Sequence, residues 1–162
     1  MKRFSLRSLL IATAVAAVLL ALPMRRAIMQ KRGRDWVASQ KGHVTFSHKY
    51  DPARDEYDSR ARLWAPEWLV RILGIDFFDS VDALVLDNTE LADLKPVTDL
   101  HDLRYLAVII EIDDNLDFEP LTELPKLRHL HLDYTNISAE RLGALRKLLP
   151  NVRVDATNHP QP

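Results

Sequence analysis

The sequence predicts an α/β fold: a short solenoid of parallel strands, preceded by an N-terminal transmembrane helix and a small α/β cap. Two observations predict this fold. Apolar residues recur in one order at intervals of 22 to 24 residues between positions 81 and 157, and repeats of that length are typical of solenoids. The first 24 residues contain a stretch of 17 uncharged residues enclosed by basic residues, which is typical of membrane spans and signal sequences.

Composition and charge limit the classes of function. Cysteine is absent, so the chain has no disulfide framework, no thiolate metal ligand and no cysteine nucleophile. Residues 1–34 hold eight of the 22 basic side chains and no acid, which leaves 14 basic against 23 acidic side chains, a net charge of −9, for the rest. A globular part this acidic repels phosphate backbones, so we expect no nucleic-acid partner.

The uncharged stretch runs from Ser8 to Met24. A helix of that length spans roughly 26 Å, the short end of what crosses a bilayer. A cleaved signal peptide would end in a small-x-small site, whereas Pro23, Arg25 and Arg26 follow the apolar run here. We therefore predict an uncleaved, single-pass anchor in residues 1–24 that contacts the membrane through residues 8–24. A signal peptide and a soluble core helix are the alternatives.

Basic residues flank the span on both sides, with a small excess after it. This excess favours a cytoplasmic globular part, but its small size leaves the side of the membrane open. Residues 25–42 follow without a proline and end at Lys41-Gly42. We predict a juxtamembrane helical stalk over residues 25–42, with Gly42 in the left-handed conformation that ends many helices.

Residues 43–80 are predicted to form an N-terminal cap of the solenoid. The alternating residues His43–Ser47 predict a strand, the charged segment Asp51–Arg62 an exposed loop, and Ala65–Gly74 a helix of about two turns. The cap also carries an aromatic and apolar cluster made of Trp68, Leu69, Ile72, Phe77 and Phe78. We expect this cluster to cover the open edge of the first repeat; a binding patch is the alternative.

Residues 81–157 carry four copies of one pattern. Val81–Thr89 and Leu127–Thr135 share apolar residues at places one, four and six, Asp at seven and Thr at nine. Degenerate copies start at Leu103 and Leu149, which gives periods of 22, 24 and 22 residues. Each copy predicts a strand whose alternate residues point inward. These inward residues are Leu84 and Leu86, Leu106 and Val108, Leu130 and Leu132, and Val152 and Val154.

The segments that return from one strand to the next are of two predicted kinds. After the first two strands, the spacing of apolar residues and a proline, Pro96 and then Pro120, predicts compact returns of 3₁₀ type. After the third strand, Ser138 is placed to cap a helix over residues 139–149. Residues 158–162 are predicted to form a flexible tail.

On these motifs, residues 81–157 resemble bacterial leucine-rich repeats, with Thr where many members carry Asn. The return Leu91–Val97 is similar to internalin-type repeats, and Ile137–Leu149 is similar to the helical type. The chain as a whole resembles bacterial single-pass membrane proteins that carry a few such repeats. The resemblance implies recognition of a protein partner through the concave face formed by the parallel strands.

The variable residues of that face are therefore the expected partner-binding site. They are Asp87, Asn88, Ile109, Ile110, His129, His131, Asp133, Tyr134, Arg153 and Asp155. Ile109, Ile110 and Tyr134 are suitable apolar anchors. Because the face has only a few strands, its surface is small and we expect weak or assisted binding. The open strand edge after Val154 is a candidate site for weak homo-oligomer formation.

Catalytic and metal chemistry is the alternative hypothesis. His129, His131 and Asp133 alternate along one predicted strand and so share a face, as metal ligands can, and Asp87, Asp133 and Asp155 form a predicted row of carboxylates. Such residues are more often simply variable surface positions of a repeat scaffold. We therefore predict a non-enzymatic interaction module without a metal or cofactor; a metal-dependent or carboxylate-based enzyme and a structural envelope protein remain alternatives.

Overall fold

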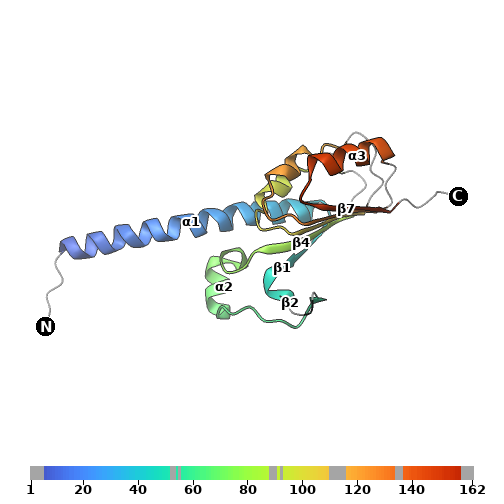
Figure 1. Ribbon diagram of the computed structural model, residues 1–162. Helices are drawn as coiled ribbons and strands as arrows, with labels where there is room; N and C mark the ends of the chain where they lie inside the picture. Colours follow the sequence, from blue (N-terminus) through green and yellow to red (C-terminus); the bar gives the residue numbers. More distant parts are fainter. Residues whose placement is uncertain are drawn as a thin grey trace.

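A computed structural model of the chain describes residues 6–51, 54, 56–87, 91, 93–109, 116–133 and 137–157. This part of the chain is a mixed α/β structure with a long N-terminal helix that projects from a folded body (Figure 1). Of the sequence predictions, Asn88, Ile110, Tyr134 and the tail 158–162 lie outside the described residues.

The body is built on a five-stranded, mostly parallel sheet. Its strands are β1 (His43–Phe46), β4 (Val81–Leu86), β5 (Tyr105–Ile109), β6 (His129–Asp133) and β7 (Arg153–Thr157), in the spatial order β1-β4-β5-β6-β7. β4 to β7 pair in parallel, and β1 pairs antiparallel to β4 at one edge. The apolar residues at places four and six of the repeats point to one face, where Leu84, Leu106 and Leu130 form a buried column.

The register of the last strand differs from the sequence prediction. Leu130 pairs with Val154, not with Val152, so the fourth copy is displaced by two residues and the strands recur at intervals of 22, 24 and 24 residues. The reason is the helical return: after α3 (Ala139–Leu148), residues 149–152 form a turn before β7 begins. Because the shift is an even number, the same set of side chains still faces the core.

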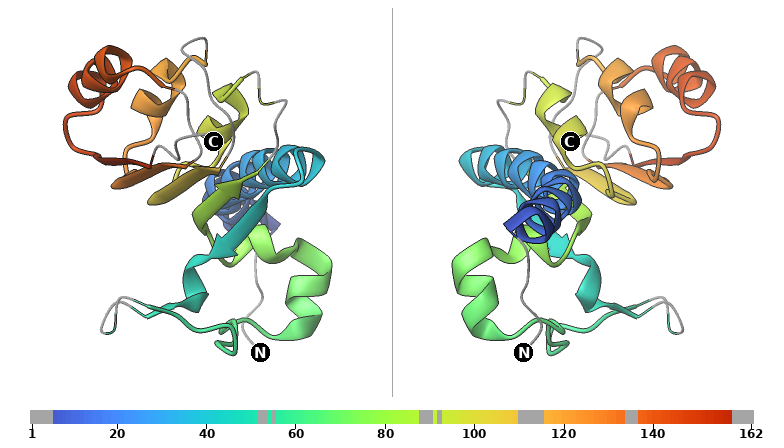
Figure 2. Two further views of the ribbon diagram at one scale, coloured as in Figure 1. Left: turned by 90° about the vertical axis from the view of Figure 1, so that its right-hand side faces the viewer. Right: turned by 90° about the vertical axis from the view of Figure 1, so that its left-hand side faces the viewer.

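The returns cover the core face of the sheet, as Figures 1 and 2 show. Those after β4 and β5 contain the 3₁₀ helices η3 (Lys95–Asp99) and η4 (Glu119–Glu123), which confirms the two predicted compact returns. The third contains α3, and the Ser138 hydroxyl accepts a hydrogen bond from the Arg141 N–H at 3.1 Å. This N-cap was predicted from the sequence.

The N-terminal helix α1 is continuous from Leu6 to Ser39 and includes Pro23. Its last third packs on the body: Ala27, Gln30 and Val37 are buried, and α1 contacts β1, η3 and the 3₁₀ helix η2 (Ile75–Phe77). The predicted stalk over residues 25–42 is therefore packed against the folded body from Ala27 to Val37. Burial of Val37 among β4 and return residues explains why this segment does not extend freely into water.

One detail of the stalk and one of the cap also differ from the predictions. The left-handed residue after α1 is Lys41, with φ 59°, and Gly42 is instead required by close packing, because a Cβ there would lie 2.8 Å from the Val85 carbonyl oxygen. The helix α2 (Glu67–Leu73) forms as predicted, but Trp68 and Ile72 on it are exposed. Strand β1 and the last third of α1 cover the edge of the sheet that this apolar cluster was expected to cover.

Candidate functional site

A hollow of about 350 Å³ opens where β4, β5 and β6 begin. On its other side lies the short hairpin of β2 (Tyr50–Asp51) and β3 (Glu56–Tyr57), which follows β1 through the 3₁₀ helix η1 (Ser47–Lys49). We call this hollow the edge pocket. It is lined by Tyr50, Tyr57, Asp82, Arg104, Tyr105, Arg128 and His129.

The repeat places the charged residues of the edge pocket side by side. Arg104 and Arg128 each precede a parallel strand by one residue, and Asp82 occupies the matching position of β4. The backbone N–H of Arg104 donates to the Asp82 carbonyl at 2.8 Å, and that of Arg128 donates to the Arg104 carbonyl at 2.9 Å. Neighbouring strands therefore place the carboxylate of Asp82 and the guanidinium groups of Arg104 and Arg128 side by side, at the end of the sheet where these strands begin.

Asp82 is the buried charge of this pocket, with 3% of its surface exposed. Its Oδ2 accepts a hydrogen bond from the Tyr57 hydroxyl at 2.8 Å, and its Oδ1 accepts one from Arg104 Nε. The Arg104 guanidinium also lies over the Tyr50 ring, 4.6 Å from its centroid. A buried carboxylate needs such partners because its desolvation is costly, so Asp82 fixes the hairpin to the sheet.

The pKa values follow from this arrangement. Burial and the hydrogen bond to Asp82 raise the pKa of Tyr57 well above its ordinary value, so Tyr57 remains a neutral donor. Burial lowers the pKa of Arg104, but the hydrogen bond and negative charge of Asp82 outweigh it and the net pKa is raised. Tyr57, Asp82 and Arg104 therefore hold one another in a fixed, neutralised group.

Arg128 is the uncompensated charge of the edge pocket. Its side chain is exposed, and within the described part of the chain it forms no ion pair. The exposed His129 stands beside it, with its ring centroid 6.4 Å from that of Tyr105. With Asp82 neutralised by Arg104, the pocket presents a guanidinium and aromatic surface, which suits a carboxylate or another anion attached to a flat apolar group.

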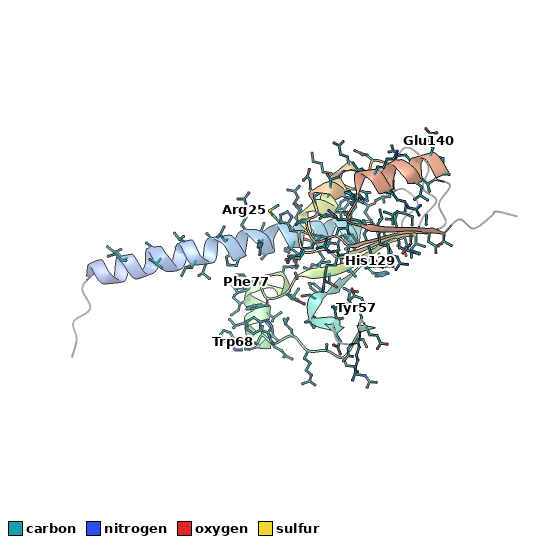
Figure 3. All side chains as sticks on the ribbon, in the orientation of Figure 1. Arg25, Tyr57, Trp68, Phe77, His129 and Glu140 are labelled. Carbon is teal, nitrogen blue, oxygen red and sulfur yellow. The ribbon has the colours of Figure 1, made fainter. Side chains whose placement is uncertain are left out.

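The outer face of the sheet, opposite the core face, holds the described residues that were predicted to bind a partner. His129 lies beside Arg153, His131 beside Asp155, and Ile109 beside Asp133 in the parallel register. Asp87 is exposed just after β4. Of the predicted residues that the structure describes, His129 alone lines the edge pocket, and Figure 3 shows it on the side of the sheet away from Glu140 of α3.

The predicted row of carboxylates is not continuous. The shifted register places Asp155 beside His131, while Asp133 lies beside Thr157. Asp155 pairs instead with Arg153, Nε to Oδ2 at 2.9 Å, on the exposed strand β7. Asp155 therefore does not extend a row formed with Asp133.

His129, His131 and Asp133 do alternate along β6 as predicted. Alternate residues of a strand stand roughly 6.6 Å apart along the chain. Within the described residues, no group of three or more His, Asp or Glu side chains is arranged to hold a metal ion. A zinc site on β6 would therefore need side-chain rearrangement or a ligand from elsewhere.

A second polar cluster joins η1 to the segment before β4. Asp79 accepts hydrogen bonds from the Ser47 hydroxyl and from the Ser80 backbone N–H, the latter at 2.9 Å, and its other oxygen contacts His48 Nδ1. A nucleophilic serine would donate its hydroxyl proton to the imidazole, whereas Ser47 donates to the carboxylate. The three side chains thus resemble a catalytic triad in composition but are connected as a structural link.

The sequence predictions missed most of the edge pocket. Arg104 and Arg128 share place two of their repeats, two residues before the first inward position, so the recurrence of arginine at that place could have pointed to the pocket. The sequence did not indicate the contribution of Tyr50 and Tyr57, because Tyr57 lies in the segment Asp51–Arg62 that was expected to be an exposed loop, and Tyr50 lies directly before it. Their approach to Asp82 depends on the fold of the hairpin.

Comparisons with known proteins give a match among solved structures but none among families or curated proteins. No protein-family model matches the chain, and no curated protein matches it. Among solved structures, the chain is similar to a leucine-rich repeat protein of Leptospira interrogans, with 29% identity over 44% of this chain and 18% of that chain and a TM-score of 0.35. The chain therefore spans less than a fifth of the length of that protein.

Proposed function

We propose that this protein is a single-pass, membrane-anchored module of leucine-rich repeat type that binds a protein partner without catalysis. The partner binds across the outer face of the sheet and inserts an acidic side chain into the edge pocket. The observation that carries the proposal is the edge pocket itself: Arg128 has no ion-pair partner among the described residues and lines the same pocket as three tyrosines.

The assignment to the leucine-rich repeat type is supported by the spacing of the strands along the sequence. Parallel neighbours at intervals of 22, 24 and 24 residues, with leucine, valine or, in the last strand, alanine at the inward places, fit repeats that each form one strand and one return. The returns lie on the core face, which leaves the opposite face of β4 to β7 open to a partner.

Membrane anchoring is supported by the first half of α1. This half contains a run of exposed apolar side chains that includes Leu10, Ile11, Val18, Leu19 and Leu22. One described helix, over Thr13–Ser39, is long and apolar enough to cross a membrane. A continuous exposed apolar surface of this length is unfavourable in water, and a bilayer removes it from water.

Protein binding is supported by the kinds of side chain in the pocket. Tyrosine and arginine are enriched among the residues that contribute most to protein interfaces, because each combines a large contact area with directional hydrogen bonds. Arg128 supplies charge, and Tyr105 and Tyr57 supply flat surface beside it. An aspartate or glutamate next to an apolar residue on the partner fits this combination.

A photo-crosslinking experiment on the full-length protein in its native membrane tests the proposal. A photoreactive residue is placed at His129, beside the pocket, or at Glu140, exposed on α3 across the sheet (Figure 3). We expect a discrete crosslinked protein from position 129 alone, and its loss on Arg128→Glu. The crosslinked peptide of the partner should contain an aspartate or glutamate.

Two outcomes contradict the proposal. The same crosslinked bands from positions 129 and 140 show that the outer face has no special role, and the absence of a discrete band from both supports the structural envelope alternative. The enzyme alternative is tested separately by titrating the full-length protein with zinc. Heat of zinc binding that disappears in the variant His131→Ala would show that the functional site is the group His129, His131 and Asp133, and not the edge pocket.

A further inference from the structure

Three large apolar side chains are exposed on and beside α2. Trp64 is 76% exposed, Trp68 63% and Ile72 70%. Trp68 and Ile72 are four residues apart within α2, a spacing that places their side chains on one face of the helix, and Trp64 lies just before the helix begins. The Trp64 ring is nonetheless held in place, because it packs edge-on against Phe78 with 5.7 Å between ring centroids. We call Trp64, Trp68 and Ile72 the α2 ridge.

The α2 ridge lies at the end of the body from which the exposed half of α1 emerges. Figures 1 and 2 show α2 to one side of α1 and running across its direction, and Figure 3 shows Trp68 at the same end of the body as Arg25. A helix that crosses α1 in this way would lie along the surface of a bilayer that α1 crosses along the bilayer normal. The ridge is therefore at the depth where the apolar half of α1 ends.

Polar contacts fix η2, the segment that directly follows α2, relative to α1. The segment η2 follows α2 after Gly74, and its Asp76 pairs with Arg34 of α1 at 2.9 Å. Gln30 Nε2 donates to Asp76 Oδ1 at 3.1 Å and to the Asp79 carbonyl at 2.9 Å. These bonds connect the two elements within a buried region, so the ridge cannot move far from the level of Arg25 without breaking them.

Basic side chains accompany the ridge. Arg71 is exposed in the last turn of α2, and Arg25 and Arg26 are exposed at the end of the apolar part of α1. Tryptophan is enriched at the membrane–water interface, where its ring sits at the level of the lipid headgroups. Exposed arginines near that level attract anionic headgroups. The combination fits a lipid surface better than it fits an aqueous one.

We infer that the α2 ridge is a second membrane contact: Trp64, Trp68 and Ile72 insert into the headgroup region of the bilayer that α1 enters. This inference rests on the proposed membrane anchoring of α1. With two points of contact, the body cannot swing about α1, and the edge pocket is held in one orientation to the membrane. The α2 ridge therefore contacts lipid headgroups, not a second protein.

Spin labels on single cysteines test the inference, because the chain has no cysteine and each introduced thiol is unique. The full-length variants Ile72→Cys, Glu140→Cys and Val18→Cys are placed in vesicles of phosphatidylcholine and phosphatidylglycerol. Collisions with apolar oxygen and with an aqueous nickel complex report the depth of each label. We expect nickel collisions at position 72 to fall several-fold below those at position 140, with position 18 the most protected.

The result that overturns the inference is equal nickel access at positions 72 and 140 while position 18 stays protected; the anchor then stands without the ridge. Nickel access at position 18 overturns both proposals. In the background Trp64→Ser with Trp68→Ser, we expect protection at position 72 to disappear while that at position 18 remains. Spin–spin broadening at position 72 that vanishes on dilution with unlabelled protein would assign the ridge to a second copy of the chain and overturn the inference.

Discussion

The two halves of α1 have opposite relations between composition and burial. The first half, up to Met24, is almost entirely apolar, and its described side chains from Leu10 onward are mostly exposed. The second half contains Gln30, Arg34 and other polar residues, yet it packs into the body. Hydropathy alone therefore does not identify the half that belongs to the protein core. The described side chains of the apolar half are mostly exposed, which is why a bilayer is the environment proposed for it.

Shape and hydrogen bonding explain how the polar half is buried. Gly33 lets the helix approach η3, since a Cβ there would lie 3.0 Å from Leu100 Cδ2. Gln30 is satisfied on both ends of its amide, because its Nε2 donates to Asp76 and its Oε1 accepts from the Val81 N–H at 3.3 Å. Buried polar groups are tolerated when they are paired in this way.

The largest effect is expected for Val37→Asp, which places a charge in the buried half of α1. Val37 is 1% exposed within the core, so the new carboxylate would be buried without a partner. We expect the free energy of unfolding of the body to fall by roughly 3–5 kcal/mol. Urea unfolding of the full chain in detergent micelles, followed by near-ultraviolet circular dichroism, measures this. A loss below 1 kcal/mol would show that α1 is not part of the core.

The same substitution in the other half should act on the membrane alone. Val18 is 70% exposed, so Val18→Asp touches no core residue and should leave urea unfolding of the body unchanged. An aspartate near the centre of a span costs about 2.5–3.5 kcal/mol on insertion, which is of order a hundredfold in partition. Carbonate extraction of membranes measures the shift. Full retention of the variant in the membrane pellet would contradict the proposed anchor.

Two glycines, one closely packed in α1 and one exposed to open space in α3, separate the effect of close packing from that of helix propensity. Gly33→Val forces side-chain atoms against Leu100 and Asp99, so we expect the free energy of unfolding to fall by about 1–3 kcal/mol. Gly143 lies within α3 and has open space where a Cβ would be. Gly143→Val should cause no loss, because valine forms helix better than glycine. Equal effects in urea unfolding of the two variants would show that helix propensity, not close packing, controls α1.

Much of the fold follows from the periodic pattern in the sequence. The column of Leu84, Leu106 and Leu130 and the helix cap at Ser138 were predicted because each depends on residues close in sequence or on a repeated spacing. The packing of α1 was not predicted. It depends on Gly33 and Gln30 meeting residues roughly 50 to 70 positions away, and no local pattern marks such contacts.

The candidate site was predictable only in part for the same reason. His129 was predicted from its place on an exposed strand face, and it does line the edge pocket. Tyr57 was assigned to a solvated loop because the segment around it is rich in charge. Its hydroxyl reaches Asp82 across 25 residues, and no local pattern in the sequence marks that carboxylate as its partner.

The smallest predicted effect concerns an attachment to β4 that does not involve α1. Gln30 of α1 bonds to Val81, whereas Tyr57 of the hairpin bonds to Asp82, the next residue along β4. The pKa of Tyr57 is raised in the folded state, so its stabilising contribution is complete below about pH 10, the ordinary tyrosine value, and is lost as pH rises towards the folded value. Tyr57→Phe should therefore reduce the loss of stability between about pH 9 and pH 11, as measured by urea unfolding at each pH. If Tyr57→Phe leaves the loss of stability at alkaline pH unchanged, the hairpin does not contribute to the stability of the sheet. In that case α1 stabilises β4 without help from the hairpin.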